Sequence, residues 1–512
     1  MDFPWLTVIG AVPLAGSAAI AVLPKAAASR AKLVALGVSL VALVLTVVAA
    51  TQFETSRAGE IQLSQVHSWI GEFGVSYAVG VNGIGLVMIA LSAVLVPLCV
   101  LAAWNEVDDE KARLFFGLVM VLEAMMIGVF AARDLFLFYV FFEAMLIPVY
   151  FLIGTFGGNE QRRRYAAVKF LIYSLAGGLV MLVGVIALYA AGPGGEQGFL
   201  IDNLTGLDFS SSAAERLMFV AFFIAFAIKA PMWPVHTWLP DAAAEAPSGV
   251  AVLLVGVLDK VGTFGMLTLC LPLFPQASRW AAPVVLALAV TSVLYGALLA
   301  IGQTDLKRLI AYTSISHFGF IVLGIFAMTS TGQSGSTLYM VNHGFSTAAL
   351  FLVAGFLINR RGSADIDEYG GLQRSTPVLA AGFLLAGLSS LALPGMSSFV
   401  SEFMVLTGTF IKYPGAAVVA TAGMVLAALY ILLTYQRMFT GPKKEFASGW
   451  KDASAREVWV VAPLIAVIIF MGIYPKPVLD VINPAVSTTM QQVGVTDPSA
   501  TVTADTVEGE NK

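Results

Sequence analysis

Apolar stretches of roughly 20 residues, separated by short connections, recur about fourteen times along this 512-residue chain. A helix of that length crosses about 30 Å of hydrocarbon, the thickness of a bilayer core. With 58% hydrophobic and only 12% charged residues, the composition excludes an ordinary soluble domain. The sequence therefore predicts a polytopic membrane protein. Its expected spans begin near residues 3, 31, 82, 113, 134, 165, 215, 246, 281, 308, 334, 375, 414 and 457.

The apolar stretches are continuous and do not alternate with polar residues, as the strands of a membrane barrel would. Glycine and alanine are frequent within them, which favours close packing of helices in lipid. We therefore predict an all-α polytopic fold with about 14 transmembrane helices.

Several classes of function lack their usual residues. The two cysteines, Cys99 and Cys270, lie inside apolar stretches, so a cysteine-held iron–sulfur cluster is excluded. No Rossmann fingerprint, P-loop or metal-ligand spacing is present in the sequence. The net charge of -4 argues against a nucleic-acid partner. We expect no cofactor and no metal ion on this chain.

The basic residues predict the orientation in the membrane. The N-terminus has no basic segment and carries Asp2, so we expect the first span to be retained rather than cleaved as a signal. With fourteen spans, most of the 28 Lys and Arg residues fall in loops on one face. The positive-inside rule makes that face cytoplasmic and places both termini outside.

Two of the expected spans are interrupted by proline beside an ionisable residue. Lys229 lies in FVAFFIAFAIKAPMWPVHTWLP, directly before Pro231 and Pro234. An ammonium group near the bilayer midplane costs roughly 2.5 to 3.5 kcal/mol on insertion scales, and proline removes helical hydrogen bonds. The second interruption, at Pro394 in LLAGLSSLALPGMSSFVSEFMVL, lies beside Glu402.

Paired interruptions of this kind are typical of inverted-repeat transporters with an ion path at the repeat interface. A single proline kink would need no transport function. We expect helices 1–3 in residues 1–110, two inverted five-helix repeats in 111–275 and 276–440, a loop and helix 14 in 441–490, and a polar tail in 491–512.

Two acids lie within apolar stretches upstream of Lys229. Glu143, in LFLFYVFFEAMLIPVYFLI, either pairs with a lysine such as Lys229 or is protonated and bonded to a backbone carbonyl. Glu123, in FGLVMVLEAMMIGVF, either extends a proton path or bonds a neighbouring helix. Asp134 opens the Glu143 helix and is predicted to be its N-cap.

Further ionisable residues follow Lys229. Asp259 and Lys260 are adjacent in VLLVGVLDKVGTFGMLTLC, so on a helix they point about 100° apart and need not pair. Lys260 belongs either to a proton relay or to a structural ion pair. His317 and His343 lie in successive spans with Ser and Thr neighbours, and either pass a proton or are bonded core residues.

The proline-rich segment PVHTWLPDAAAEAP follows Lys229 and contains His236, Asp241 and Glu245. It is either a rigid interfacial turn or a proton entrance. The sequence does not distinguish these two interpretations.

Six sequence strings together resemble the antiporter-like subunits of respiratory NADH:quinone oxidoreductase, complex I. These strings are KAPMWPVHTWLPDAAAEAP, FFEAMLIPVYFLI, LDKVGTFGM, QTDLKRLIAYTSISHFGF, VNHGFSTAALFLVAG and LALPGMSSFVSEF, within about residues 110 to 440. The M-type (chain 4) branch fits best, because Glu402 stands where the L-type and N-type relatives carry lysine. That branch also lacks a long lateral helix, which nothing after Pro475 is expected to form.

The resemblance implies a relay role for the buried charges. Glu143 and Lys229 would form the central pair and Glu402 the terminal group. Ala243 departs from the family, where histidine is common, and Asn82 stands where aspartate is common. The first departure weakens the case for an entrance at His236. The other implied members are Lys260, His317 and His343, with Glu123, His236, Asp241 and Asp259 as possible accessories.

The implied function is that of a proton-translocating subunit in a bacterial inner (plasma) membrane. FMN, iron–sulfur clusters and quinone would be held by other subunits, and the partners would be other membrane subunits of complex I, especially the L-type and N-type ones. The alternatives are a subunit of a multisubunit sodium/proton antiporter or membrane-bound hydrogenase, and a scaffold that transports nothing.

Overall fold

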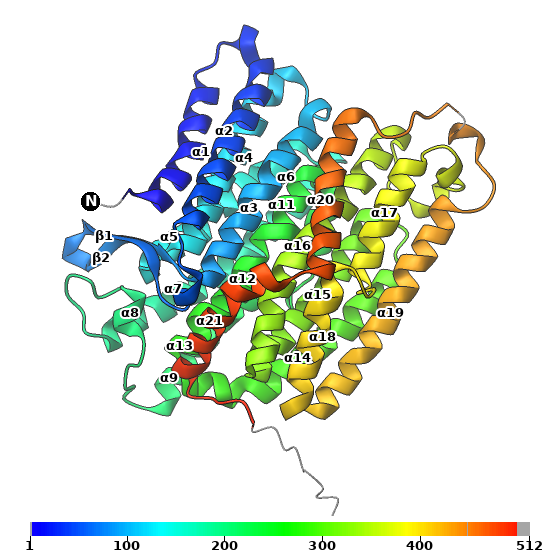
Figure 1. Ribbon diagram of the computed structural model, residues 1–512. Coiled ribbons are helices and arrows are strands. Elements are labelled where there is room, and N and C mark those ends of the chain that lie inside the picture. The colour runs from blue at the N-terminus through cyan, green and yellow to red at the C-terminus, as the bar shows by residue number, and fades with distance from the viewer. Residues whose placement is uncertain (1–2, 448, 499–512) are drawn as a thin grey trace, which may run out of the picture.

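The computed structural model describes residues 3–447 and 449–498. Most of this chain is helical, and Figure 1 shows the long helices side by side, from α1, α2 and α4 at one end of the row to α17 and α19 at the other. The first helices are α1 (Trp5–Ala21), α2 (Ala31–Thr51), α3 (Gly83–Ala102), α4 (Asp109–Ala131), α5 (Leu135–Ala144), α6 (Leu146–Phe156) and α7 (Glu160–Ala191).

The helices that follow include several short ones. They are α8 (Ile201–Leu204), α9 (Ser212–Lys229), α10 (Trp238–Glu245), α11 (Ser248–Leu253), α12 (Lys260–Gly265) and α13 (Leu271–Leu273). The rest are α14 (Pro275–Ile301), α15 (Leu306–Ala327), α16 (Ser330–Arg361), α17 (Pro377–Ser390), α18 (Ser397–Lys412), α19 (Pro414–Phe439), α20 (Ala455–Ile473) and α21 (Lys476–Val493).

Within the described part of the chain, 11 helical segments are long and apolar enough to cross a membrane. The chain is thus a multi-span membrane protein, and the predicted helical fold class is confirmed. The other three expected spans correspond to α1, which is shorter, and to two interrupted helices, α9–α10 and α17–α18. A count of about fourteen spans and the inverted repeats stay predictions.

The most enclosed span is a composite helix, Ser248–Leu273, whose most apolar window is completely buried. In it α11, α12 and α13 are joined by two π-helical turns, Leu254–Leu258 and Met266–Cys270. We call this segment the central helix. It packs against α3 and α16, so its side chains meet other helices on several sides.

A β-hairpin was not among the predicted elements. Strands β1 (Gln62–Ile70) and β2 (Val75–Val81) pair antiparallel, and the turn between them closes at Gly74, whose φ is 71°. The hairpin reaches the helix that carries Glu143: Ser76 N–H donates to Asp134 Oδ2 at 2.8 Å. Asp134 also accepts from the amides of Phe136 and Leu137, which confirms the predicted N-cap.

Helix α21 follows Pro475, where no span was expected. It buries one apolar face and leaves the other face polar. Such an amphipathic helix has no continuous apolar stretch, so its sequence does not resemble that of a membrane span. Residues 491–493 of the predicted tail belong to this helix, and residues 499–512 of that tail lie outside the described part. The buried face consists of Ile482, Ala485, Val486, Thr489, Met490 and Val493.

Candidate functional site: a buried line of charged and polar side chains

Lys229 is the last residue of α9, where the predicted interruption occurs. The bonds that the break removes are replaced locally. Trp238 Nε1 donates to the carbonyl oxygen of Ile228 at 2.9 Å, and Trp233 N–H donates to Ser292 Oγ at 2.9 Å. These contacts fix the end of α9 and hence the position of the lysine.

The ammonium group of Lys229 is fully enclosed, with 0% of the residue exposed. Across residues 3–447 and 449–498, Nζ has no hydrogen-bond partner. It lies 4.6 Å from the ring centroid of Phe142, a cation–π contact. An aromatic face compensates for only part of the hydration that the ammonium group loses on burial, so the charge of Lys229 is incompletely compensated.

Glu143 is next to Phe142 at the end of α5, and its side chain is half-buried. Its carboxylate lies against α7, so close to Gly178 that a Cβ there would overlap Oε1. No ion pair joins Glu143 to Lys229 among the described residues. The predicted direct pair is absent from this structure because the carboxylate lies against α7 and the ring of Phe142 adjoins Nζ.

Asp259 and Lys260 diverge on the central helix, as their spacing predicted. Both residues are 0% exposed. Lys260 Nζ donates to the carbonyl oxygen of Val255 and lies 2.6 Å from His343 Nδ1. Neither carboxylate oxygen of Asp259 has a hydrogen-bond partner in the described part of the chain.

The two predicted histidines are neighbours. The ring centroids of His343 on α16 and His317 on α15 lie 5.2 Å apart. Two tyrosines continue the line. The hydroxyl of Tyr430 lies 3.2 Å from His317 Nε2, and Tyr339 donates its hydroxyl to Glu402 Oε2 at 2.9 Å.

The tyrosines are functional candidates that sequence reasoning missed. Tyr339 and Tyr430 are at most 1% exposed. Tyrosine is common in apolar spans, so neither drew notice, although a buried hydroxyl normally needs a partner. The structure therefore brings Lys260, His343, His317 and Glu402 into one buried region.

The second interruption, between α17 and α18, is held by short polar side chains. Ser389 Oγ lies 3.2 Å from Ser397 Oγ, which bridges the two halves. Asn342 Nδ2 on α16 donates to the carbonyl oxygen of Ser397 at 2.7 Å and to Ser401 Oγ at 3.2 Å. Glu402, in the second half, is 2% exposed.

Two accessory candidates are isolated. Glu123 is 0% exposed, and both its oxygens lack a hydrogen-bond partner in the described residues. His236 is 2% exposed with both ring nitrogens unpartnered there, and its ring meets that of Tyr295 edge-on at 5.1 Å. No hydrogen bond among the described residues connects either of them to the buried row of Lys260, His343, His317 and Glu402.

Asp241 and Glu245 form ion pairs instead. Asp241 binds Lys169 of α7 at 2.7 Å and Arg308 of α15 at 2.6 Å. Glu245 binds Arg162 at 3.1 Å. These contacts brace α10 against two neighbouring helices, which supports the interpretation of a rigid interfacial turn over a proton entrance.

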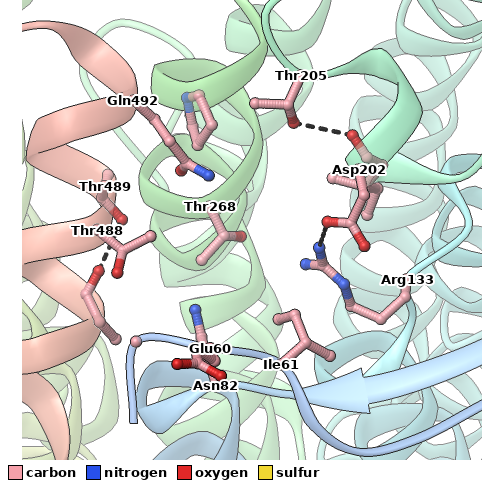
Figure 2. Close-up of a pocket in the computed structure, with 14 residues that line it drawn as sticks. Glu60, Ile61, Asn82, Arg133, Asp202, Thr205, Thr268, Thr488, Thr489 and Gln492 are labelled. Carbon is pink, nitrogen blue, oxygen red and sulfur yellow. Dashed lines mark hydrogen bonds and ion pairs between the residues drawn. The ribbon is translucent and has the colours of Figure 1, made fainter. Parts of the chain in front are cut away.

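A polar cavity of about 280 Å³ opens beside the hairpin (Figure 2). Figure 2 shows Arg133 and Asp202 on one side and Thr488, Thr489 and Gln492 of α21 on the other. Glu60 lies at its rim, where a hydrogen bond from Arg57 and the charge of that guanidinium lower the pKa of the carboxyl. None of the predicted relay residues lines this cavity.

Among the residues that the structure describes, no group of three or more His, Cys, Asp or Glu side chains is arranged to hold a metal ion.

Comparison with known proteins identifies the family. A family model described as NADH:quinone oxidoreductase/Mrp antiporter, TM, matches residues 132–429. NADH-quinone oxidoreductase subunit M of Mycobacterium tuberculosis is 48% identical over an alignment that covers 98% of this chain and 96% of the relative. The chain belongs to the NADH-quinone oxidoreductase subunit M family. The resemblance seen in the sequence strings, including the M-type branch, is confirmed.

Two solved structures have a similar fold. A chain of respiratory complex I from Thermus thermophilus with bound NADH matches with a TM-score of 0.86 and 31% identity, and the match covers 96% of this chain and 100% of that one. A chain of the Mrp complex from Dietzia sp. matches with a TM-score of 0.83 and 22% identity, with coverage of 96% and 100%. The second likeness shows a common fold alone.

Proposed function

We propose that this chain is the proton-translocating membrane subunit of an NADH:quinone oxidoreductase and does no electron transfer of its own. Quinone reduction elsewhere in the complex would drive protons along the buried line. The observation that carries this proposal is the run of enclosed contacts from Lys260 through His343 to His317, whose ring adjoins Tyr430 and, at 5.9 Å between centroids, Tyr339, the donor to Glu402. Burying a row of titratable groups inside a membrane costs free energy, and a role in proton transport explains why the chain has them.

Each step has an identifiable donor and acceptor. Protonated Lys260 donates to His343 Nδ1, which accepts when that ring is neutral. The two imidazole rings are not hydrogen-bonded to each other, so a proton crosses between them by ring rotation or through water. Beyond His317, the hydroxyls of Tyr430 and Tyr339 both donate and accept, and Glu402 holds or releases the proton.

The energy of quinone reduction would reach this chain at Glu143 and Lys229, which precede Lys260 in the proposed path. A change of field near Glu143 alters how well the Lys229 ammonium is compensated, and an uncompensated buried ammonium favours its neutral form. Loss of that charge would change the electrostatics at Lys260. Because coupling between binding equilibria is reciprocal, proton movement at Glu402 would act back on the Glu143 end in the same way.

The proposal places the chain in a bacterial inner membrane with both termini on the outer face. Its partners would be other membrane subunits of complex I, in particular the L-type and N-type ones, with FMN, iron–sulfur clusters and quinone on other subunits. The inverted repeats in 111–275 and 276–440 would each carry an interrupted helix, α9–α10 and α17–α18. One-sided labelling of cysteines placed in successive loops checks this topology.

Glu402→Gln in the assembled complex tests the function. We expect NADH:quinone turnover coupled to proton release in sealed vesicles to fall by about tenfold, a change of ~1.4 kcal/mol in the barrier. The control is Glu196→Gln, at an exposed loop acid. Unchanged proton release per electron at full turnover in Glu402→Gln would return that residue to a structural role.

A further inference from the structure

Lys229 and Asp259 are opposite charges buried in the same helix interface without a bonded partner. Both residues are 0% exposed, and neither the ammonium group nor the carboxylate oxygens have a hydrogen-bond partner within the described residues. A single ion removed from water costs several kcal/mol, whereas two opposite ions brought together offset part of that cost. Their joint burial therefore calls for a common explanation.

The backbones of α9 and the central helix touch at the residues in question. A Cβ on Gly262 would lie 2.5 Å from the carbonyl oxygen of Phe226 and 2.6 Å from the amide nitrogen of Ala230. Only a glycine allows this approach. The two residues that Gly262 approaches, Phe226 and Ala230, lie before and after Lys229 in the chain. Asp259 is three residues before Gly262, so it lies on the same face of the central helix and faces the end of α9.

Asp259 lies in the electrostatic field of both lysines, with Lys260 the stronger influence and Lys229 the weaker, but Lys260 makes no hydrogen bond to it and is engaged elsewhere. Lys260 projects about 100° away from its neighbour around the helix. Its ammonium group is engaged by the carbonyl oxygen of Val255 and by His343 Nδ1, and it lies 4.8 Å from the ring centroid of Phe318. Lys229 also has an aromatic contact, with Phe142, but its ammonium group makes no hydrogen bond among the described residues and lies within electrostatic range of the carboxylates of both Glu143 and Asp259.

We propose that Asp259 is a second counter-charge of Lys229, so that the ammonium group is held between two carboxylates, Glu143 of α5 and Asp259 of the central helix. This inference rests on the proposed function and deepens it. When the Glu143 carboxylate lies against Gly178, as it does here, Asp259 compensates for the charge of Lys229. When Glu143 turns inward, the ammonium group moves to it on its flexible four-carbon stem.

Movement of the ammonium group between Glu143 and Asp259 gives Lys229 two positions and couples Glu143 to Lys260. Drawn toward Glu143, the ammonium group leaves Asp259 uncompensated beside Lys260, which strengthens the hold on the proton of Lys260. Drawn toward Asp259, it weakens that hold and favours transfer to His343. No covalent bond changes in the exchange, and Asp259 is a positioning residue for the lysines.

A double-mutant cycle in the assembled complex tests this. Asp259→Asn is made alone, with Lys229→Ala and with Lys260→Ala, and Asp259→Glu serves as the conservative variant. Coupled turnover, protons released per electron, and the amount and thermal stability of the assembled complex are measured for each. We expect Asp259→Asn to slow turnover about tenfold and Asp259→Glu to restore part of it.

The stability readout is specific to the pairing. Lys229→Ala leaves Asp259 as an uncompensated buried charge, so it lowers assembly, and adding Asp259→Asn restores assembly because both charges are then gone. No such rescue is expected in the Lys260→Ala background. Wild-type turnover in Asp259→Asn, or rescue of Lys260→Ala rather than Lys229→Ala, would overturn the inference.

The same cycle separates this inference from the proposed function. If Lys229→Ala pumps normally, the relay fails whatever Asp259 does. If Lys229→Ala abolishes pumping while Asp259→Asn neither slows turnover nor rescues assembly, the relay stands and the second counter-charge does not.

Discussion

The two interrupted helices carry opposite charges in opposite surroundings. Lys229 ends the first half of its helix, where the partial negative charge of the helix C-terminus favours a cation. Glu402 lies in the second half of its helix, in the second turn of α18, beyond the first turn in which the partial charge of a helix N-terminus favours an anion. The helix terminus therefore stabilises the charge of Lys229 and has little effect on that of Glu402.

The polar contacts of the two charges differ more. Glu402 accepts a hydrogen bond from Tyr339, whereas the ammonium group of Lys229 meets an aromatic ring. A bonded charge is fixed in place, and a charge without a hydrogen bond can be moved by a change of field. The difference suggests that the Lys229 end responds to the redox reaction and the Glu402 end delivers the proton.

The largest expected effect comes from making the Glu402 end resemble the Lys229 end. Tyr339→Phe removes a hydrogen bond to a buried carboxyl group, worth ~1.5–3 kcal/mol to its ionised form. We expect coupled turnover to fall by about tenfold with the complex still assembled. Tyr430→Phe, which loses a contact with His317 instead, should be milder. Equal rates in both variants and wild type would contradict the comparison.

A smaller effect is expected from disturbing the Lys229 end. Gly178→Ala places a methyl group where Glu143 Oε1 now lies, and the carboxylate can move because it ends a flexible side chain. Held near Lys229, it should slow the exchange of partners and lower turnover by about threefold, a barrier change of ~0.6 kcal/mol. Proton release and turnover in vesicles measure this.

Gly37→Ala is the matched control for that variant, since a Cβ on Gly37 meets nothing within 4 Å. Gly178→Ala with the turnover of Gly37→Ala would mean that the position of the Glu143 carboxylate has no effect on the rate.

The smallest effect concerns the scaffold of the first interruption. Trp238→Phe keeps an aromatic ring but leaves the Ile228 carbonyl oxygen without its donor, at a cost of ~1–3 kcal/mol in stability. We expect a lower inactivation temperature with nearly normal turnover at low temperature. Trp459→Phe, at an exposed position, is the control. A large loss of turnover without loss of stability would assign Trp238 a direct role.

Much of the site could be predicted from sequence because charge and proline are conspicuous in apolar helices. Lys229, Glu402 and both interruptions were found in this way. The direction in which each carboxylate points was not predicted, because the sequence alone does not show how far one helix is rotated relative to the next. That is why the contact of Glu143 with Gly178 was missed.

Other parts of the fold left weak signals. The hairpin is a two-stranded element between spans and has no apolar stretch to mark it. Helix α21 buries only one face, so its mean hydropathy falls below that of a span. Tyr339 and Tyr430 are ordinary core residues by composition, and only their positions on neighbouring helices bring them to Glu402 and His317.

The π-helical turns of the central helix have a further consequence. A π turn holds one more residue than an α turn, and the turn at Leu254–Leu258 directly precedes Asp259 and Lys260. If the residues Leu254–Leu258 took regular α pitch, everything beyond them would rotate by about 100°, and Asp259 would then face where Lys260 now does. Removing one residue at the same time would cancel that rotation, because the π turn accommodates its extra residue in nearly the same arc as an α turn. The local pitch of one turn therefore sets the surroundings of two adjacent charges, and a change of pitch there would exchange those surroundings without altering any charged group.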